Sequence, residues 1–347
     1  MGRCTRERQL VPAVSALTVV LLVGLVVGSV RGSIPVQEEA AAWRDRSAEG
    51  SAGAAYPLLF VGADSGAPSW FWEMRRHGVG RVLLVVTWHQ SDVEADHLYD
   101  GPLSLGEDVL VRVMAAAREA AMGVTLMPIL YLDEVGPGRW RGTIQPRCRR
   151  TWWRSYEERV LALASLAEAG GAERFVVGSE LGSMEGDPQW SSLIQGVRER
   201  FSGRVTYAAN WDRYSETTLW PMLDEVGVSH YAPWQGSAGA RIGVDALEDL
   251  RAFGLRVGRP VVLVEVGFPS VASAALRPWD YAAAGAAAPL LQAELYEGLF
   301  RWLDAQGDDM VFFLWSWFGQ GGPQDRGYTP RRKPAAQVLR EKRWGGR

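Results

Sequence analysis

Two glutamates in the sequence each lie at the end of an apolar run. Glu180 closes the segment "RFVVGSE" at residues 174–180, and Glu265 lies within "PVVLVEVG" at residues 260–267. When two carboxyl groups face each other, one can keep a proton and act as a general acid while the other stays ionised as a nucleophile or base. Hydrolysis of a glycosidic bond requires that division of roles. A salt bridge to an arginine is the alternative role for either glutamate alone, and the presence of two favours the catalytic interpretation.

A repeating fold is needed to bring these distant residues together. Amphipathic helical segments, such as residues 110–121 and 291–303, alternate with short apolar segments, as expected for strands separated by helices. The eight candidate strands are residues 57–63, 81–88, 123–132, 174–180, 204–210, 225–232, 260–267 and 310–317. Continuous apolar strands suit a parallel sheet that is covered on both faces, and eight such units predict a (β/α)8 TIM barrel.

A doubly wound open sheet is the structural alternative. Such a fold usually has a glycine-rich phosphate loop after its first strand. The corresponding segment, "VGADSGAPSW" at residues 61–70, does not have that form. The barrel is therefore favoured, as an α/β fold with a single catalytic domain.

The N-terminal residues have the pattern of an export signal. Three arginines precede an uncharged, mostly apolar run from Leu10 to Val30. This pattern predicts either a cleaved signal peptide or a signal anchor over residues 1–32, because the run is close to the length that spans a bilayer. The small and charged residues 33–55 predict a linker, followed by the hydrolase domain at 56–347. We therefore expect a secreted domain, or a membrane-anchored one held outside the cytoplasm through residues 10–30.

The composition argues against several other classes of protein. A formal net charge of -3 provides no basic field for binding nucleic acid. With only four histidines and no HExxH-like pair, neither a catalytic metal nor another cofactor is expected. Sixteen tryptophans supply flat faces suited to stacking on sugar rings, although most of them are expected in the core. An oligosaccharide or polysaccharide is the partner that these features favour.

The active site of a TIM barrel is built at the C-terminal ends of the strands and on the loops that follow them. His89 could bind a sugar hydroxyl or only cap its strand, and Arg141 could clamp the substrate or pair with an acidic loop residue. The ten candidate substrate-binding residues are Trp88, His89, Trp140, Arg141, Ser179, Asn210, Trp211, Tyr231, Trp234 and Trp315.

Several segments resemble glycoside hydrolase family 113, a family of clan A retaining enzymes whose known members include β-mannanases. The resemblance covers about residues 56–345. Its motifs are "WRGTIQP" at 140–146, "VVGSELGSME" at 176–185, "FSGRVTYAANWD" at 201–212, "LWPMLDEVGVSHYAPW" at 219–234 and "RPVVLVEVGFPS" at 259–270. The resemblance implies a retaining hydrolase of β-linked glycans, including β-1,4-mannan or manno-oligosaccharides, that works by double displacement without a cofactor. Glu180 would then be the acid/base, Glu265 the nucleophile, and Tyr231 a hydrogen-bond donor to the nucleophile.

Two positions depart from the pattern of this family. Ser179 stands where many clan members carry an asparagine that binds the sugar 2-hydroxyl, and residues 126–129 read "LMPI" where "LKPH" is expected. The change at residues 126–129 replaces polar groups near the bound sugar by apolar ones. Either the sugar preference has drifted, or His89 or Asp133 supplies the polar contact. The alternative function is a non-catalytic carbohydrate-binding or envelope-associated barrel, since a fold alone does not secure an activity.

Overall fold

The computed structural model describes residues 52–57, 67–234, 236–306 and 310–342 of the chain. The predicted signal or anchor segment lies outside these residues, and so do most of the predicted linker and residues 58–63 of the first candidate strand. The first described strand, β1 (Ala52–Pro57), begins within the last residues of the predicted linker. Within the described part, no helix combines the length and hydropathy needed to cross a bilayer.

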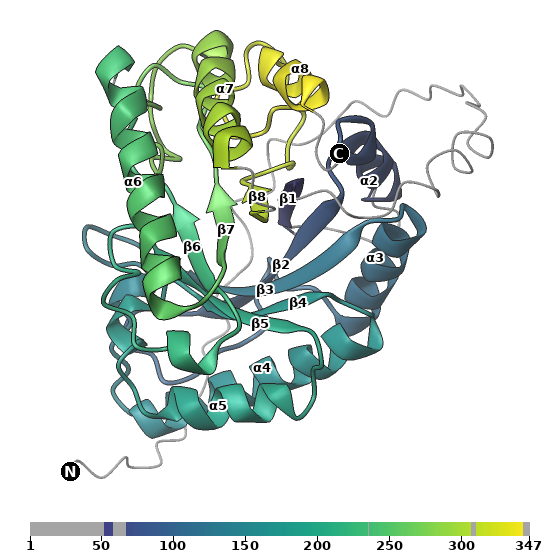
Figure 1. Cartoon of the computed structure of the whole chain (residues 1–347). Coiled ribbons are helices and arrows are strands. Elements are labelled where there is room, and N and C mark those ends of the chain that lie inside the picture. Colours follow the sequence, from purple (N-terminus) through teal and green to yellow (C-terminus); the bar gives the residue numbers. More distant parts are fainter. Residues whose placement is uncertain (1–51, 58–66, 235, 307–309, 343–347) are drawn as a thin grey trace, which may run out of the picture. The chain divides into compact units, whose positions relative to one another are not determined.

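Eight parallel strands follow one another in chain order around a closed barrel, in which β1 pairs with both β2 and β8 (Figure 1). The α/β barrel expected from the sequence is thus confirmed, and the seven strands after β1 overlap their predicted segments. These strands are β2 (Arg81–Gln90), β3 (Gly123–Leu132), β4 (Arg174–Ser179), β5 (Arg204–Asn210), β6 (Val226–His230), β7 (Val261–Val266) and β8 (Phe312–Leu314).

Helices connect most of the strands. The α-helices are α2 (Ala67–Arg76), α3 (Glu107–Glu119), α4 (Arg149–Ala169), α5 (Gln189–Arg198), α6 (Gly236–Val257), α7 (Pro289–Gln306) and α8 (Pro334–Glu341). Three short 3-10 helices lie in the loops, namely η1 (Arg141–Thr143), η2 (Gly182–Met184) and η3 (Trp220–Met222). The connection from β5 to β6 is fully described and contains η3 but no α-helix, so the barrel departs from an ideal (β/α)8 repeat at this point.

Alternation along the strands creates two apolar layers, because successive side chains of a strand point to opposite faces. In β2, Leu84, Val86 and Trp88 belong to the cluster that also contains the buried faces of the helices. Leu83 and Val85 belong to a second cluster that is made only of strand residues and fills the barrel interior. Its other buried members are Met127, Val176, Ala208, Val262, Val264 and Phe313.

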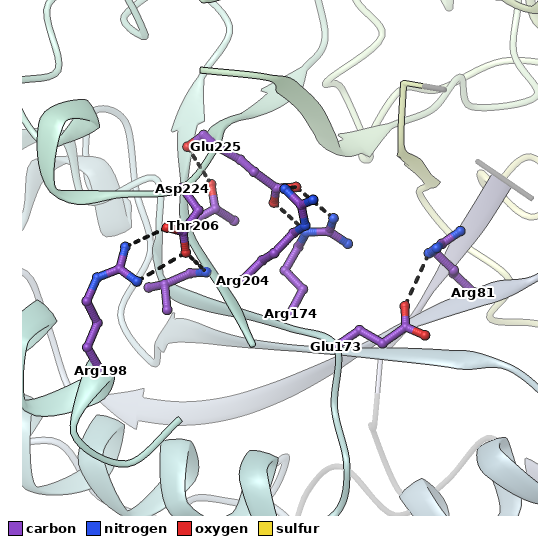
Figure 2. Close-up of polar contacts among 9 residues, drawn as sticks. Arg81, Glu173, Arg174, Arg198, Arg204, Thr206, Asp224 and Glu225 are labelled. Atoms are coloured by element: carbon purple, nitrogen blue, oxygen red, sulfur yellow. Dashed lines mark hydrogen bonds and ion pairs between the residues drawn. The ribbon is translucent and has the colours of Figure 1, made fainter. Parts of the chain in front are cut away.

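Charged side chains form a layer at the N-terminal ends of the strands (Figure 2). Arg174, the first residue of β4, donates two hydrogen bonds of 2.5 and 2.8 Å to Glu225, and both side chains are buried. Asp224 accepts hydrogen bonds from Arg198 and from the backbone N–H of Val205. Since active sites of such barrels lie at the opposite strand ends, these contacts serve the stability of the fold.

Candidate active site

Glu180 follows the last residue of β4 and adopts a left-handed backbone conformation with φ of 55°. Few non-glycine residues adopt this conformation, which must be held by its surroundings. The N–H of Glu180 donates to the carbonyl of Ala208 at 2.8 Å, and the N–H of Leu181 donates to the hydroxyl of Tyr207 at 2.7 Å. These contacts with β5 fix the backbone on both sides of the Glu180 side chain, which is largely buried.

Glu265 lies on β7 and is 3% exposed. Its Oε2 accepts a hydrogen bond of 2.9 Å from the hydroxyl of Tyr231, and its Oε1 has no partner among the described residues. Burial raises the pKa of Glu265 to about 7, and the negative charge of Glu180 acts in the same direction. The positive charge of Arg141 and the Tyr231 hydrogen bond oppose this increase in pKa. The two carboxyl groups therefore interact electrostatically at the ends of β4 and β7.

Arg141, in η1 after β3, donates a hydrogen bond from Nη2 to Oε2 of Glu180. Burial would lower the pKa of this guanidinium, but the nearby charges of Glu180 and Glu265 outweigh burial and raise it. Arg141 thus pairs with an acidic residue, but that residue is Glu180 at the strand end and not a residue of the loops. The salt bridge considered as an alternative role for Glu180 is also present, within the same cluster as the second carboxyl group.

Ser179 and Trp315 are two further predicted substrate-binding residues near the strand ends. Ser179 precedes Glu180 and is buried, and its hydroxyl has no hydrogen-bond partner among the described residues. Trp315 follows β8 and packs with Ile129 against the cluster that fills the barrel interior, and both side chains remain partly exposed. Ile129 is one of the two positions where "LMPI" replaces polar residues of the family, and Met127, the other, is buried in the same cluster. The barrel interior is therefore apolar at these two positions of β3.

Two of the predicted substrate-binding tryptophans lie near the C-terminal ends of their strands, but their side chains pack in the core. Trp88 is on the helix-facing side of β2, where its ring contacts Tyr156 of α4 edge to face. Trp234 is almost fully buried against Phe268, and Gly243 and Gly298 leave space for its ring against α6 and α7. The predictions for Trp88 and Trp234 are corrected accordingly, since both side chains pack in the core.

His89 faces the interior side of β2, but both of its ring nitrogens are used within the protein. Nδ1 is 2.7 Å from Oδ1 of Asp133, and Nε2 accepts a hydrogen bond of 3.3 Å from the backbone N–H of Leu103. The ring is buried, and Gly101 lies directly against it. The structure thus favours the second of its predicted roles, in which His89 organises the end of β2 rather than binding a sugar.

The remaining predicted residues lie on the loops. Trp140 precedes Arg141 and is 39% exposed, so its ring is available at the surface. Asn210 ends β5, and its carbonyl accepts hydrogen bonds from the backbone N–H groups of the turn that follows. Trp211 stacks on Trp279, with ring centroids 6.0 Å apart and an angle of 21° between the rings.

Sequence reasoning missed Trp279 and Tyr328. Trp279 lies in the loop after β7, and Tyr328, in the loop after β8, contacts the ring of Tyr231. Neither loop has a periodic pattern of apolar residues, so only the aromatic residue types themselves could have marked them as candidates. Among the described residues, no group of three or more His, Cys, Asp or Glu side chains is placed to hold a metal ion.

An α/β barrel with paired carboxyl groups at the ends of β4 and β7 has the architecture of a glycoside hydrolase. The sequence model of Glycoside Hydrolase Family 113 matches residues 63–330, and the chain belongs to this family of glycoside hydrolases. No curated protein sequence matches the chain.

Solved structures of mannanases, two of them from family 113, share the fold. A family 113 β-1,4-mannanase is 22% identical, with a TM-score of 0.75 over 84% of this chain and 97% of that one. The family 113 β-mannanase of Alicyclobacillus acidocaldarius is 23% identical, with a TM-score of 0.74 over 84% of this chain and 95% of that one. The endo-1,4-β-D-mannanase of Thermotoga petrophila RKU-1 is 14% identical, with a TM-score of 0.58 over 84% and 97% of the two chains.

Proposed function

We propose that this glycoside hydrolase cleaves β-linked glycans with retention of configuration, and that β-1,4-mannan or manno-oligosaccharides are its substrates. The observation that carries the proposal is the environment of Glu265, a buried carboxyl group that Tyr231 orients and whose pKa responds to Glu180. The names of the family 113 structures, which are β-mannanases, support the choice of mannose.

The proposed reaction has two steps. In the first, the ionised Glu265 attacks the anomeric carbon through Oε1, while Glu180 gives its proton to the glycosidic oxygen and the aglycone leaves as an alcohol. In the second, Glu180 takes a proton from water, the water oxygen bonds to the anomeric carbon, and the bond to Glu265 breaks. Oε2 accepts the hydrogen bond from Tyr231, which leaves Oε1 as the oxygen assigned to the attack.

The contact between Arg141 and Glu180 restricts which oxygen carries the proton. Arg141 donates to Oε2, and a guanidinium has donors but no acceptor. The proton of the acid form would therefore reside on Oε1 of Glu180. Glu265 must lose its proton before attack, and the positive charge of Arg141 favours that loss. Arg141 thus contacts the proposed acid/base and favours the ionised form of the proposed nucleophile.

Substrate binding would combine one polar contact with several aromatic surfaces. The unpartnered hydroxyl of Ser179 is placed next to the acid/base and is proposed to accept or donate a hydrogen bond to a sugar hydroxyl. Trp315, Trp140 and the stacked pair of Trp211 and Trp279 offer ring faces for the sugars on either side of the cleaved bond.

One observation favours a second candidate function. The apolar Met127 and Ile129 at the top of the barrel interior remove polar groups that family members are expected to use. A barrel with weakened contacts to the sugar at the reaction centre could bind glycans without turning them over. A non-catalytic carbohydrate-binding or envelope-associated protein is therefore the alternative that the experiment must exclude.

The experiment compares the full chain with its Glu265→Ala and Glu180→Ala variants on β-1,4-linked manno-, gluco- and xylo-oligosaccharides. New reducing ends are measured, and NMR identifies the anomer that forms first. Release of the β-anomer from manno-oligosaccharides by the wild type, with no turnover by Glu265→Ala, is the expected result. The α-anomer as first product would exclude retention. Binding without turnover of any series would favour the alternative function.

We also propose, from the N-terminal sequence, that the domain is exported. Cell fractionation with N-terminal sequencing tests this proposal. A mature N-terminus near residue 33 indicates a cleaved signal peptide, and an intact N-terminus in the membrane fraction indicates an anchor. An intact protein in the cytoplasm would contradict both forms of export.

A further inference from the structure

A chain of buried hydrogen bonds runs behind the backbone of Glu180. The N–H of Leu181 donates to the hydroxyl of Tyr207 at 2.7 Å, and that hydroxyl donates to Oε1 of Glu185 at 2.9 Å. Oε2 of Glu185 accepts a further hydrogen bond of 2.8 Å from the hydroxyl of Thr217. None of these four residues is more than 6% exposed. The proposed catalytic mechanism uses none of these contacts.

The direction of the chain follows from its donors and acceptors. A tyrosine hydroxyl has one proton, and once that proton is donated to Glu185 the oxygen can accept from Leu181. A hydrogen bond to an ionised carboxylate is stronger than one between neutral groups, and it polarises the hydroxyl toward better acceptance. Burial raises the pKa of Glu185, but the hydrogen bonds from Thr217 and Tyr207 favour its ionised form. Glu185 is thus the acceptor at which the chain ends.

The other end of the chain is the peptide group between Glu180 and Leu181, which helps to fix the conformation of Glu180. Glu180 has φ of 55°, a conformation that side chains other than glycine rarely adopt. The N–H of Glu180 donates to the carbonyl of Ala208, and the N–H of Leu181 donates to the hydroxyl of Tyr207. Two consecutive residues of β5 therefore hold these two N–H groups. We propose that Tyr207 and Glu185 are positioning residues that hold the Glu180 carboxyl group where it transfers the proton. This inference rests on the proposed role of Glu180 as the acid/base.

Tyr207→Phe tests the proposal, and Tyr156→Phe is its matched control. Both tyrosines are fully buried, and both contact the ring of Trp190. The hydroxyl of each forms a hydrogen bond with the backbone of β4 or of the residues that follow it. The hydroxyl of Tyr156 donates to the carbonyl of Val177 at 2.7 Å, whereas that of Tyr207 holds the N–H of Leu181. The two variants lose a similar buried hydroxyl, but only one loses the contact behind Glu180.

The kinetic measurement uses the full chain with two substrates, a manno-oligosaccharide and 2,4-dinitrophenyl β-mannobioside. The first has a poor leaving group that requires the acid, and the second has a leaving group that departs without protonation. We expect Tyr207→Phe to lower kcat/KM on the oligosaccharide by about 10- to 100-fold and to leave kcat/KM on the dinitrophenyl substrate near the wild-type value. On that second substrate kcat should fall and be restored by azide, which attacks the intermediate without a base.

Tyr156→Phe should change kcat/KM on both substrates by the same factor, because a general loss of packing does not depend on the leaving group. Glu185→Gln should resemble Tyr207→Phe with a smaller effect, since its amide oxygen can still accept from Tyr207. An equal loss on the two substrates in Tyr207→Phe, without rescue by azide, would overturn the proposal.

Amide hydrogen exchange supplies a readout that does not require turnover. Loss of its acceptor should make the amide of Leu181 exchange faster in Tyr207→Phe but not in Tyr156→Phe, as followed by mass spectrometry of the peptide 178–186. Equal exchange in both variants would reject the positioning role. If the wild type turns over neither substrate, the proposed function fails by itself, and the exchange experiment still decides whether Tyr207 holds the segment.

Discussion

The guanidinium group of Arg141 donates a hydrogen bond to the carboxylate of Glu180, and its positive charge also interacts electrostatically with Glu265. Because a positive charge favours the ionised form of a carboxyl group, Arg141 limits how far burial can raise the pKa of Glu265. One loop arginine after β3 therefore acts on the carboxyl groups that β4 and β7 supply.

Arg141→Gln should move the acid limb of the kcat/KM profile to higher pH. The free enzyme must have Glu265 ionised, so kcat/KM rises with pH through the pKa of that group, near 7 in the wild type. Removal of the positive charge raises this pKa further. Arg149→Gln, which breaks the ion pair with Asp187, is the control and should leave the limb in place. An unshifted limb in Arg141→Gln would show that Arg141 does not control the ionisation of Glu265.

Tyr231→Phe should lower kcat/KM by at least about tenfold and move the same limb to higher pH. The Tyr231 hydroxyl donates to Oε2 of Glu265, and a hydrogen bond to a charged group contributes about 1.5–3 kcal/mol. The kinetics of the variant across pH give both quantities. A fall in kcat/KM without a shift of the limb would assign Tyr231 to binding the substrate rather than to stabilising the ionised nucleophile.

Relative to the wild type, Glu265→Gln should be more stable at pH 8 than it is at pH 5. In the folded state the pKa of Glu265 is raised to about 7, so folding favours its neutral form. The contribution of this group to stability is present in full at acidic pH and is lost as the pH rises through its folded pKa. An amide cannot ionise and avoids this loss. Thermal unfolding of wild type and variant at both pH values gives the comparison, and an equal difference in Tm at the two would contradict the prediction.

Glu225→Gln should lower the free energy of unfolding by about 3–5 kcal/mol, because it leaves the buried Arg174 without its charged partner. The two side chains are only 6% and 5% exposed. Arg112→Ala breaks an exposed ion pair with Asp108 and should change the free energy by less than about 1 kcal/mol. Urea unfolding of both variants measures the difference. Similar losses in the two would show that burial of the Arg174 pair has little effect.

Trp279→Ala should raise KM for long manno-oligosaccharides several-fold and leave kcat nearly unchanged. Stacking of an aromatic ring contributes about 0.5–1.5 kcal/mol, and Trp279 presents a ring that is 45% exposed and held by Trp211. Tyr281→Ala, two residues away and 85% exposed, is the control. A reduced kcat with unchanged KM would place Trp279 in the chemical step instead of in binding.

The apolar strands were predictable from the sequence because parallel strands buried on both faces need continuous apolar residues. The segments of β3 and β5 have the bounds that were expected, 123–132 and 204–210. The β5–β6 connection was less predictable, since no rule of periodicity states that a helix is replaced by η3. Trp88 and His89 illustrate another limit. Both end an apolar run, but the pleat of β2 sends Trp88 toward α4 and His89 toward the barrel interior.

The candidate site was predictable only as far as its residues lie at strand ends. Glu180, Glu265 and Tyr231 follow or end apolar segments, and this placement marked them. Tyr207 lies in the middle of an apolar strand and looks like a core residue, because its hydrogen bonds to Leu181 and Glu185 join segments that are distant in the sequence. Such long-range polar contacts leave no local pattern.

The helix-free connection between β5 and β6 has a consequence for protein engineering. Residues 211–225 begin with Trp211 at the mouth, include Thr217 behind the Glu180 loop, and end with Asp224 and Glu225 at the opposite end of the barrel. In an ideal barrel a helix would separate the residues at the mouth from those at the opposite end of the barrel. Here one short segment contains both sets of residues. Exchanging this loop to alter the substrate range would therefore also remove the contacts of Asp224 and Glu225 that stabilise the N-terminal ends of the strands. The loop after β7, which carries Trp279, is the better target for redesign.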